Sequence, residues 1–71
     1  MQFDGSKLRA ARKAAGLSRA ELAVEAKVGF NTVGRAERGD IKGIGVDKIA
    51  QLATALSLDP GTLFTENGAA A

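Results

Sequence analysis

The side chains that most often do chemistry in enzymes and metal sites are missing from this sequence. Its 71 residues include no histidine and no cysteine, which removes the commonest general base, the thiolate nucleophile and the usual zinc ligands. Asp40 and Asp47 lie seven positions apart across a glycine-rich loop and form no recognisable catalytic pair. Segment 34–40 lacks the lysine of a phosphate-binding loop, and segment 43–45 is only a fragment of a dinucleotide motif. We therefore expect no enzyme activity, no cofactor and no metal.

The chemistry that remains is positive charge. The formal net charge is +2, and the cations are concentrated near the N-terminus, whereas Asp59 and Glu66 leave the C-terminal end acidic. Two interpretations are open for the basic block: a solvated helix face, or a surface that binds a polyanion. The block contains no acid between its members, which are Lys7, Arg9, Arg12, Lys13 and Arg19.

Short helices are expected to position these side chains, because apolar residues recur at helical spacing and no stretch alternates like a strand. The clearest stripe lies in segment 46–56, where the apolar positions are Val46, Ile49, Ala50, Leu52, Ala53 and Leu56. The chain is therefore expected to be all-α, with five helices. They cover residues 6–15, 18 to 26 or 27, 30–38, 46–56 and 59–64.

Capping signals mark where these helices begin and end. Ser18 followed by Glu21 is the pattern of a capping box. Asp4 or Ser6 is suited to cap the first helix, and Asp59 before Pro60 is expected to begin the fifth. Gly16 and Gly39 are suited to the positions just after the first and third helices.

The second and third helices form an unusual pair. They are joined by the tight turn Lys27-Val28-Gly29, and Val33 is the single strong apolar anchor of the third helix. A purely structural helix of this length would normally bury more apolar side chains, whereas a recognition helix keeps a polar face for a DNA groove. The pattern therefore favours a helix-turn-helix over Ser18–Gly39.

The motifs in this region resemble the Cro and cI-type helix-turn-helix family, also called the XRE family. The resemblance spans about Lys7 to Phe64. It implies a compact five-helix domain similar to the lambda repressor DNA-binding domain. The matching motifs are GLSRAELA at 16–23, Val28, Thr32-Val33, Glu37-Arg38-Gly39, LATAL at 52–56 and segment 59–64.

The resemblance also implies roles for individual residues. The third helix would enter the major groove, and its base-facing positions are Phe30, Asn31, Thr32 and Arg35. Arginine can donate a bidentate pair of hydrogen bonds to guanine, and asparagine pairs similarly with adenine. The positions implied for phosphate contact are Arg19, Arg38 and Lys42. Arg12 and Glu37 are expected to form a structural ion pair.

Several alternatives stay open at these positions. Phe30 is compatible with contact to a thymine methyl group or with folding back into the core. Thr32 is compatible with a base or a phosphate contact, and Arg38 with a phosphate contact or with the ion-pair network around Glu37. Gly34 inside a helix indicates either close backbone approach to DNA or a tolerated weakness of roughly 1 kcal/mol. Gly29 replaces the stronger serine or threonine cap.

The sequence thus predicts a sequence-specific DNA-binding transcriptional regulator, a phage or bacterial repressor that occupies an operator. The alternatives are an antitoxin-like protein-interaction module and a DNA-bending excision or architectural factor. The expected partner is double-stranded DNA, bound by a monomer or by a homodimer that forms in solution or only on DNA. We expect a cytoplasmic protein that binds neither a membrane nor a small-molecule ligand. The expected organisation is an N-terminal arm (1–5), the domain (6–65) and a flexible tail (66–71).

Overall fold

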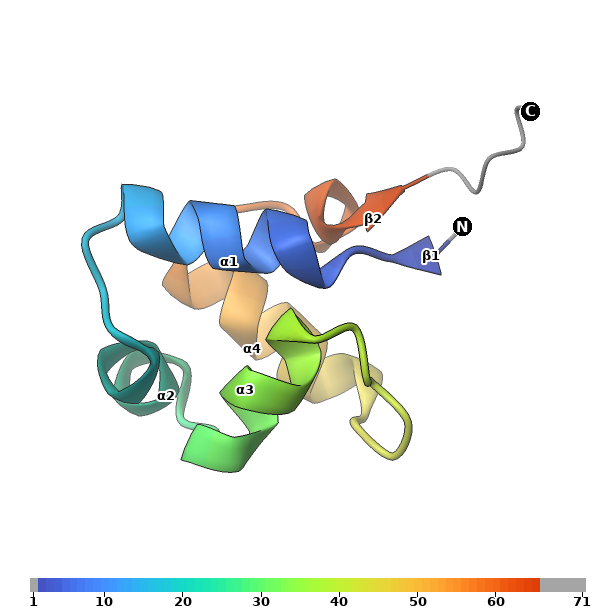
Figure 1. Cartoon of the computed structure of the whole chain (residues 1–71), viewed down its shortest axis with the longest axis horizontal. Helices are drawn as coiled ribbons and strands as arrows, with labels where there is room; N and C mark the ends of the chain where they lie inside the picture. The colour runs from blue at the N-terminus through green and yellow to red at the C-terminus, as the bar shows by residue number, and fades with distance from the viewer. Residues whose placement is uncertain (1, 66–71) are drawn as a thin grey trace.

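The computed structural model describes residues 2–65, and the tail expected at 66–71 lies outside this range. Figure 1 shows α1 lying along one side of the molecule, α2 and α3 on the opposite side, and α4 passing behind them. The elements in chain order are β1 (Gln2–Phe3), α1 (Gly5–Ala14), α2 (Arg19–Ala26), α3 (Phe30–Glu37), α4 (Val46–Ala55), a 3₁₀ turn η1 (Pro60–Leu63) and β2 (Phe64–Thr65).

Each helix and the 3₁₀ turn contribute one large, fully buried side chain to the core. These largest fully buried side chains are Leu8, Leu22, Val33, Leu52 and Leu63. Burying side chains of this size contributes about 1.5–3 kcal/mol each relative to exposure, so these five contacts hold the helices in one arrangement. The apolar stripe predicted for 46–56 is confirmed at Ile49, Leu52 and Ala53, but Val46 is exposed because it lies at the start of α4.

The predicted capping signals fix the helix ends. Ser18 accepts a hydrogen bond from the Glu21 amide, and the Glu21 side chain accepts one from the Ser18 amide, which completes the capping box. Asp4 caps α1 by accepting from the amides of Ser6 and Lys7. Gly39 follows α3 with a φ of 81°, a left-handed conformation that favours glycine. The sequence therefore predicted the four α-helices to within one or two residues at each end.

The expected fifth helix is present only as a short 3₁₀ turn, so the predicted all-α class is confirmed and the count of five helices is slightly too high. Pro60 and the Asp59 cap begin a 3₁₀ turn of only four residues, after which Phe64 adopts an extended conformation. Phe64 then pairs with Phe3 in a two-residue antiparallel ribbon, with Gln2 opposite Thr65. The short ribbon was not foreseen because two residues are too few for an alternating pattern to be visible.

The N-terminal segment is consequently part of the domain. Phe3 is buried, and its ring meets that of Phe64 edge-to-face, with centroids 5.4 Å apart. The Asp4 amide also donates to the Leu63 carbonyl at 2.7 Å. In the segment expected as an arm (1–5), residues 2–4 therefore contact residues 63–65, and Gly5 already belongs to α1. Within residues 2–65, no helix has the length and hydropathy that crossing a membrane requires.

Candidate nucleic-acid interface

The turn between α2 and α3 sets the geometry of the candidate interface. Lys27 ends α2 in a left-handed conformation, with a φ of 59°. The Val28 amide donates to the Ala23 carbonyl at 3.0 Å, and the Val28 side chain packs against the core. Gly29 then begins α3 without any side-chain hydrogen bond to the helix. The turn therefore leaves the first residues of α3 facing outward beside α2.

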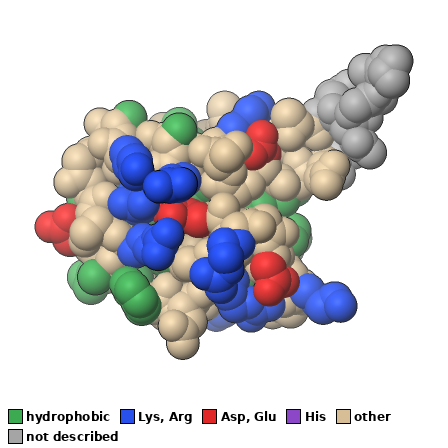
Figure 2. Space-filling model, viewed as in Figure 1, with side chains coloured by type: hydrophobic (Ala, Val, Ile, Leu, Met, Phe, Trp, Pro, Cys, Tyr) green, Lys and Arg blue, Asp and Glu red, His purple; other side chains and the backbone are tan. Residues whose placement is uncertain are grey.

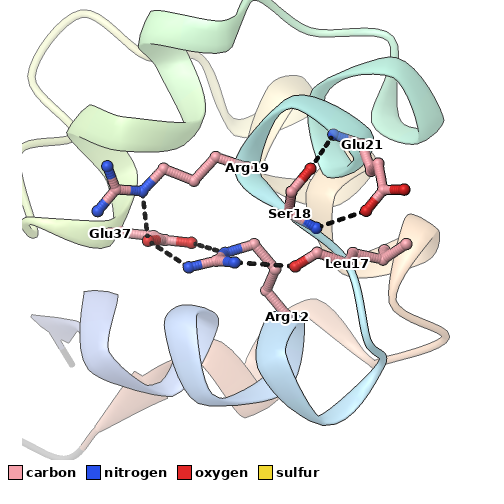
Figure 3. A network of polar contacts seen from close by, with 6 residues as sticks. All are labelled: Arg12, Leu17, Ser18, Arg19, Glu21 and Glu37. Atoms are coloured by element: carbon pink, nitrogen blue, oxygen red, sulfur yellow. Dashed lines mark hydrogen bonds and ion pairs between the residues drawn. The ribbon is translucent and has the colours of Figure 1, made fainter.

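Glu37, the last residue of α3, is the centre of a buried ion-pair network (Figure 3). The Arg12 Nε lies 2.5 Å from one Glu37 carboxylate oxygen, and the Arg12 Nη2 lies 3.4 Å from the other. Arg12 also donates from Nη1 to the Leu17 carbonyl at 2.8 Å. One guanidinium thus joins the end of α3, the body of α1 and the segment that leads into α2. The ion pair that the resemblance implies for Arg12 and Glu37 is present.

The charges around Glu37 decide its protonation state. Burial raises the pKa of this carboxyl. Hydrogen bonds from Arg12 and Arg19, together with their positive charges, lower the pKa by more than burial raises it, so that it lies below the ordinary 4.5. The Glu37 side chain is only 2% exposed. Glu37 is therefore ionised at neutral pH and balances the charges of the buried Arg12 and of Arg19, whose side chain is 45% exposed.

Arg19, at the start of α2, has a role that the sequence did not reveal. Its Nε donates to Glu37 at 3.1 Å, while 45% of the side chain stays exposed. Figure 3 shows its terminal nitrogens pointing away from Glu37. Arg19 therefore both joins the ion-pair network and presents part of its guanidinium to solvent beside the N-terminus of α2.

Three of the expected base-facing residues form the first turn of α3. Phe30 is 56% exposed, Asn31 is exposed and Thr32 is half-buried. The exposure of Phe30 excludes the alternative that its ring folds back into the core. Gly34 is buried, but a Cβ atom there would meet only an Arg38 guanidinium nitrogen at 3.5 Å, an ordinary contact, so packing within residues 2–65 does not require a glycine at this position.

Arg35, the fourth expected base-facing residue, has its guanidinium bound to the loop that follows α3. Its Nε is 3.4 Å from the Asp40 carboxylate, and its Nη2 donates to the Lys42 carbonyl. The hydrogen bond and positive charge of Arg35 lower the pKa of the Asp40 carboxyl. Arg35 lies four residues after Asn31, on the same side of α3, but its half-buried side chain is held against the loop that follows the helix.

Two cations flank this loop. Arg38 and Lys42 are exposed. Among residues 2–65, the ion-pair partners of Glu37 are Arg12 and Arg19, so Arg38 does not belong to the Glu37 network. The structure therefore leaves the side chains of Arg38 and Lys42 in solvent at the end of α3.

Comparison with known proteins identifies this arrangement. A family model described as helix-turn-helix (HTH_3) matches residues 8–63, which is most of the chain. The chain belongs to this helix-turn-helix family, the XRE type. Its α2 and α3 are the two helices for which the family is named, and its class is that of DNA-binding transcription regulators.

Three solved structures share the helix-turn-helix fold. The restriction-modification controller protein C.AhdI from Aeromonas hydrophila is 40% identical, with a TM-score of 0.76, over 84% of this chain and 89% of that protein. A chain of the SinR/SinI protein complex is 24% identical over 94% of this chain and 65% of its own length, with a TM-score of 0.78. Apo-HppE is 21% identical over 86% of this chain and 34% of that protein, with a TM-score of 0.75. Curated protein sequences gave no match.

Many basic side chains of this helix-turn-helix domain lie on the face drawn in Figure 2. Most lysine and arginine atoms on this face form two groups, one toward α1 and α2 and one toward the end of α3 and the following loop, with an acidic side chain between them. Because Glu37 carries a compensating negative charge, the cluster of Arg12, Arg19 and Glu37 holds one net positive charge rather than two. The basic block predicted from the sequence is thus divided between structural and exposed cations.

Proposed function

We propose that this helix-turn-helix domain is a sequence-specific repressor of a phage or bacterial operon and that it inserts the first turn of α3 into the major groove of an operator. The observation that carries the proposal is the exposed first turn of α3, where Phe30 and Asn31 face solvent, while the half-exposed guanidinium of Arg19 lies at the other end of α3, beside Glu37. Major-groove binding requires outward side chains for base edges on a helix that is flanked by cations for the phosphates.

Roles follow for the remaining exposed residues. Asn31 supplies the amide that pairs with adenine, Phe30 offers an apolar surface, and Thr32 lies between base and phosphate. Arg38 and Lys42 contact phosphates from the end of α3 and the loop. Arg35 reads a base only if it leaves Asp40 and the Lys42 carbonyl, so its readout requires a rearrangement of these contacts. Repression needs no chemical step, because a bound operator excludes polymerase.

The similarity to a restriction-modification controller supports a narrower role. Identity of 40% over 84% of the chain is high enough for a related regulatory task. We infer that this chain, like a restriction-modification controller, controls transcription of a small operon, and that it binds a symmetric site as a homodimer. The alternatives of a protein-interaction module and a DNA-bending factor make different predictions for binding.

Selection of bound sites from a random pool of duplex DNA tests the function. We expect enrichment of one sequence, palindromic with half-sites about one helical turn apart if a dimer binds. The affinity for the enriched site should fall steeply as salt rises, because phosphate contacts release counterions. A pool that yields no enriched sequence and shows no salt-dependent binding would favour the protein-interaction module. Enrichment accompanied by strong bending of the duplex would favour the architectural factor.

A further inference from the structure

The guanidinium of Arg19 is held at one end and free at the other. Its Nε donates to the Glu37 carboxylate at 3.1 Å, and its Nη1 and Nη2 donate to no atom of residues 2–65. A guanidinium is planar, so fixing Nε fixes the direction of the two terminal groups. In Figure 3 these groups point outward, away from the carboxylate.

Glu37 itself is held firmly in place. Arg12 contacts both of its carboxylate oxygens and is anchored in turn on the Leu17 carbonyl. Leu17 directly precedes Ser18, the cap of α2. The carboxylate that holds Arg19 is therefore fixed to the same segment that positions the start of α2.

We propose that Glu37 is a positioning residue, which holds Arg19 by its Nε so that Nη1 and Nη2 donate as a pair to one DNA phosphate beside the start of α2. The inference rests on the proposed DNA binding and assigns to Glu37 a part in it beyond the stability of the domain. An arginine used in this way reaches the phosphate already ordered, so less side-chain entropy is lost on binding.

For Glu37→Gln, the inference and simple electrostatics predict opposite changes in DNA affinity. Glu37→Gln adds one positive charge to the domain, which by charge alone strengthens the attraction to DNA. If Glu37 positions Arg19, the same substitution weakens DNA binding, because Arg19 loses its ionic anchor. Glu25→Gln is the matched control, since Glu25 is exposed on α2 and forms no ion pair within the described residues.

A second variant tests the geometry without loss of charge. Lysine carries a single nitrogen, so in Arg19→Lys the carboxylate and the phosphate compete for one atom and no paired contact forms. This variant keeps the buried contact between Arg12 and Glu37 and is expected to fold. Arg9→Lys is its control, because Arg9 is exposed on α1 and forms no ion pair within the described residues.

The experiment measures binding to a short duplex of mixed sequence at low salt, because a phosphate contact acts on any sequence. The folded state of each variant is checked by circular dichroism at the same temperature. We expect Arg19→Lys to bind about tenfold more weakly, the loss of one charge-assisted hydrogen bond, and Arg9→Lys to bind like the wild type. We expect Glu37→Gln to bind about threefold more weakly and Glu25→Gln at least as tightly as the wild type.

A double-mutant cycle completes the test. In an Arg19→Ala background, Glu37→Gln should cause no further loss of affinity, since the side chain that it positions is gone. An equal loss in both backgrounds, or wild-type affinity in Arg19→Lys, would overturn the inference. If Glu37→Gln does not fold, Arg19→Lys decides alone. A wild-type domain that binds neither this duplex nor a selected site contradicts the proposed function instead.

Discussion

Gly5 packs against the backbone of Glu37, so closely that a Cβ atom at Gly5 would overlap the carbonyl oxygens of Ala36 and Glu37. The first residue of α1 thus rests on the last turn of α3. Glu37 is therefore fixed through its backbone by Gly5 and through its side chain by Arg12. These two contacts set the position of α3, the helix whose first turn faces solvent.

Gly5→Ala should consequently destabilise the domain. The added methyl group meets backbone atoms, which cannot move aside as a flexible side chain does, so we expect a loss of about 2 kcal/mol, within the range of an overpacked core. Urea denaturation followed by circular dichroism measures this loss. Gly29→Ala is the control, because its Cβ would make only an ordinary contact with Thr32 at 3.6 Å. Equal unfolding midpoints for both variants would contradict the close packing of Gly5.

Arg12→Met should destabilise the domain as well. The substitution removes the main partner of a carboxylate that is 2% exposed, while Arg19 remains as its second cation. Breaking a buried ion pair by removing one partner costs about 3 kcal/mol. Lys13→Met is the control, since Lys13 is the exposed neighbour in sequence. The free energies of unfolding at neutral pH compare the two variants, and an equal change in both would show that the Arg12 pair adds nothing specific.

Stability should fall in acid because of Glu37. Its pKa is lower in the folded protein than the ordinary 4.5, so its ionised form adds stability above that value. The contribution is lost as the pH falls through the lower, folded-state pKa. The carboxyls of Asp4 and Asp40 also have lowered pKa values and add to the effect. We expect urea midpoints to decline from neutral pH to about pH 3.

A double variant isolates the share of Glu37 in this acid response. Asp4→Asn with Asp40→Asn removes the other two carboxyls whose pKa values are lowered, and most of the decline should persist because Glu37 remains. A stability that no longer changes with pH in this double variant would assign the effect to the two surface aspartates.

The sequence predicted the helices because their signals are local. The capping box at Ser18 and Glu21 and the apolar spacing of 46–56 depend only on neighbouring residues. The ribbon between Phe3 and Phe64 joins residues 61 positions apart, and no local pattern reports such a pairing. The same reason explains why Gly5 was expected in an arm, since its packing partner is the end of α3.

The candidate interface was foreseen in part, for a similar reason. The exposure of Asn31 follows from the helical period once Val33 is buried, so its outward position was predictable. The contacts of Arg19 with Glu37 and of Arg35 with Asp40 depend on which long, flexible side chains meet in space. Each arginine has partners within reach on more than one element, and sequence spacing alone does not choose among them.

Arg35→Ala tests whether Arg35 reads a base. If it does, the substitution weakens binding to the selected site by about 1–3 kcal/mol and relaxes the preference at one base pair. Asp40→Asn is the control, because it loosens the loop contact of Arg35 but leaves the guanidinium in place. A uniform loss over all sequences would make Arg35 a phosphate contact. A loss of stability with unchanged DNA affinity would make it a support for the loop after α3.

Phe30→Ala tests whether an apolar contact with a base contributes to sequence recognition. The Phe30 ring is 56% exposed at the first position of α3, so Phe30→Ala should change stability by less than about 0.5 kcal/mol. If the ring contacts a thymine methyl group, replacing that thymine by deoxyuridine in the selected site removes roughly 0.8 kcal/mol of binding. The replacement should have this effect on the wild type and none on Phe30→Ala, because the ring that senses the methyl group is absent. Binding isotherms for the two proteins on the two duplexes give the four affinities. Equal losses in both proteins would show that the methyl group is sensed elsewhere.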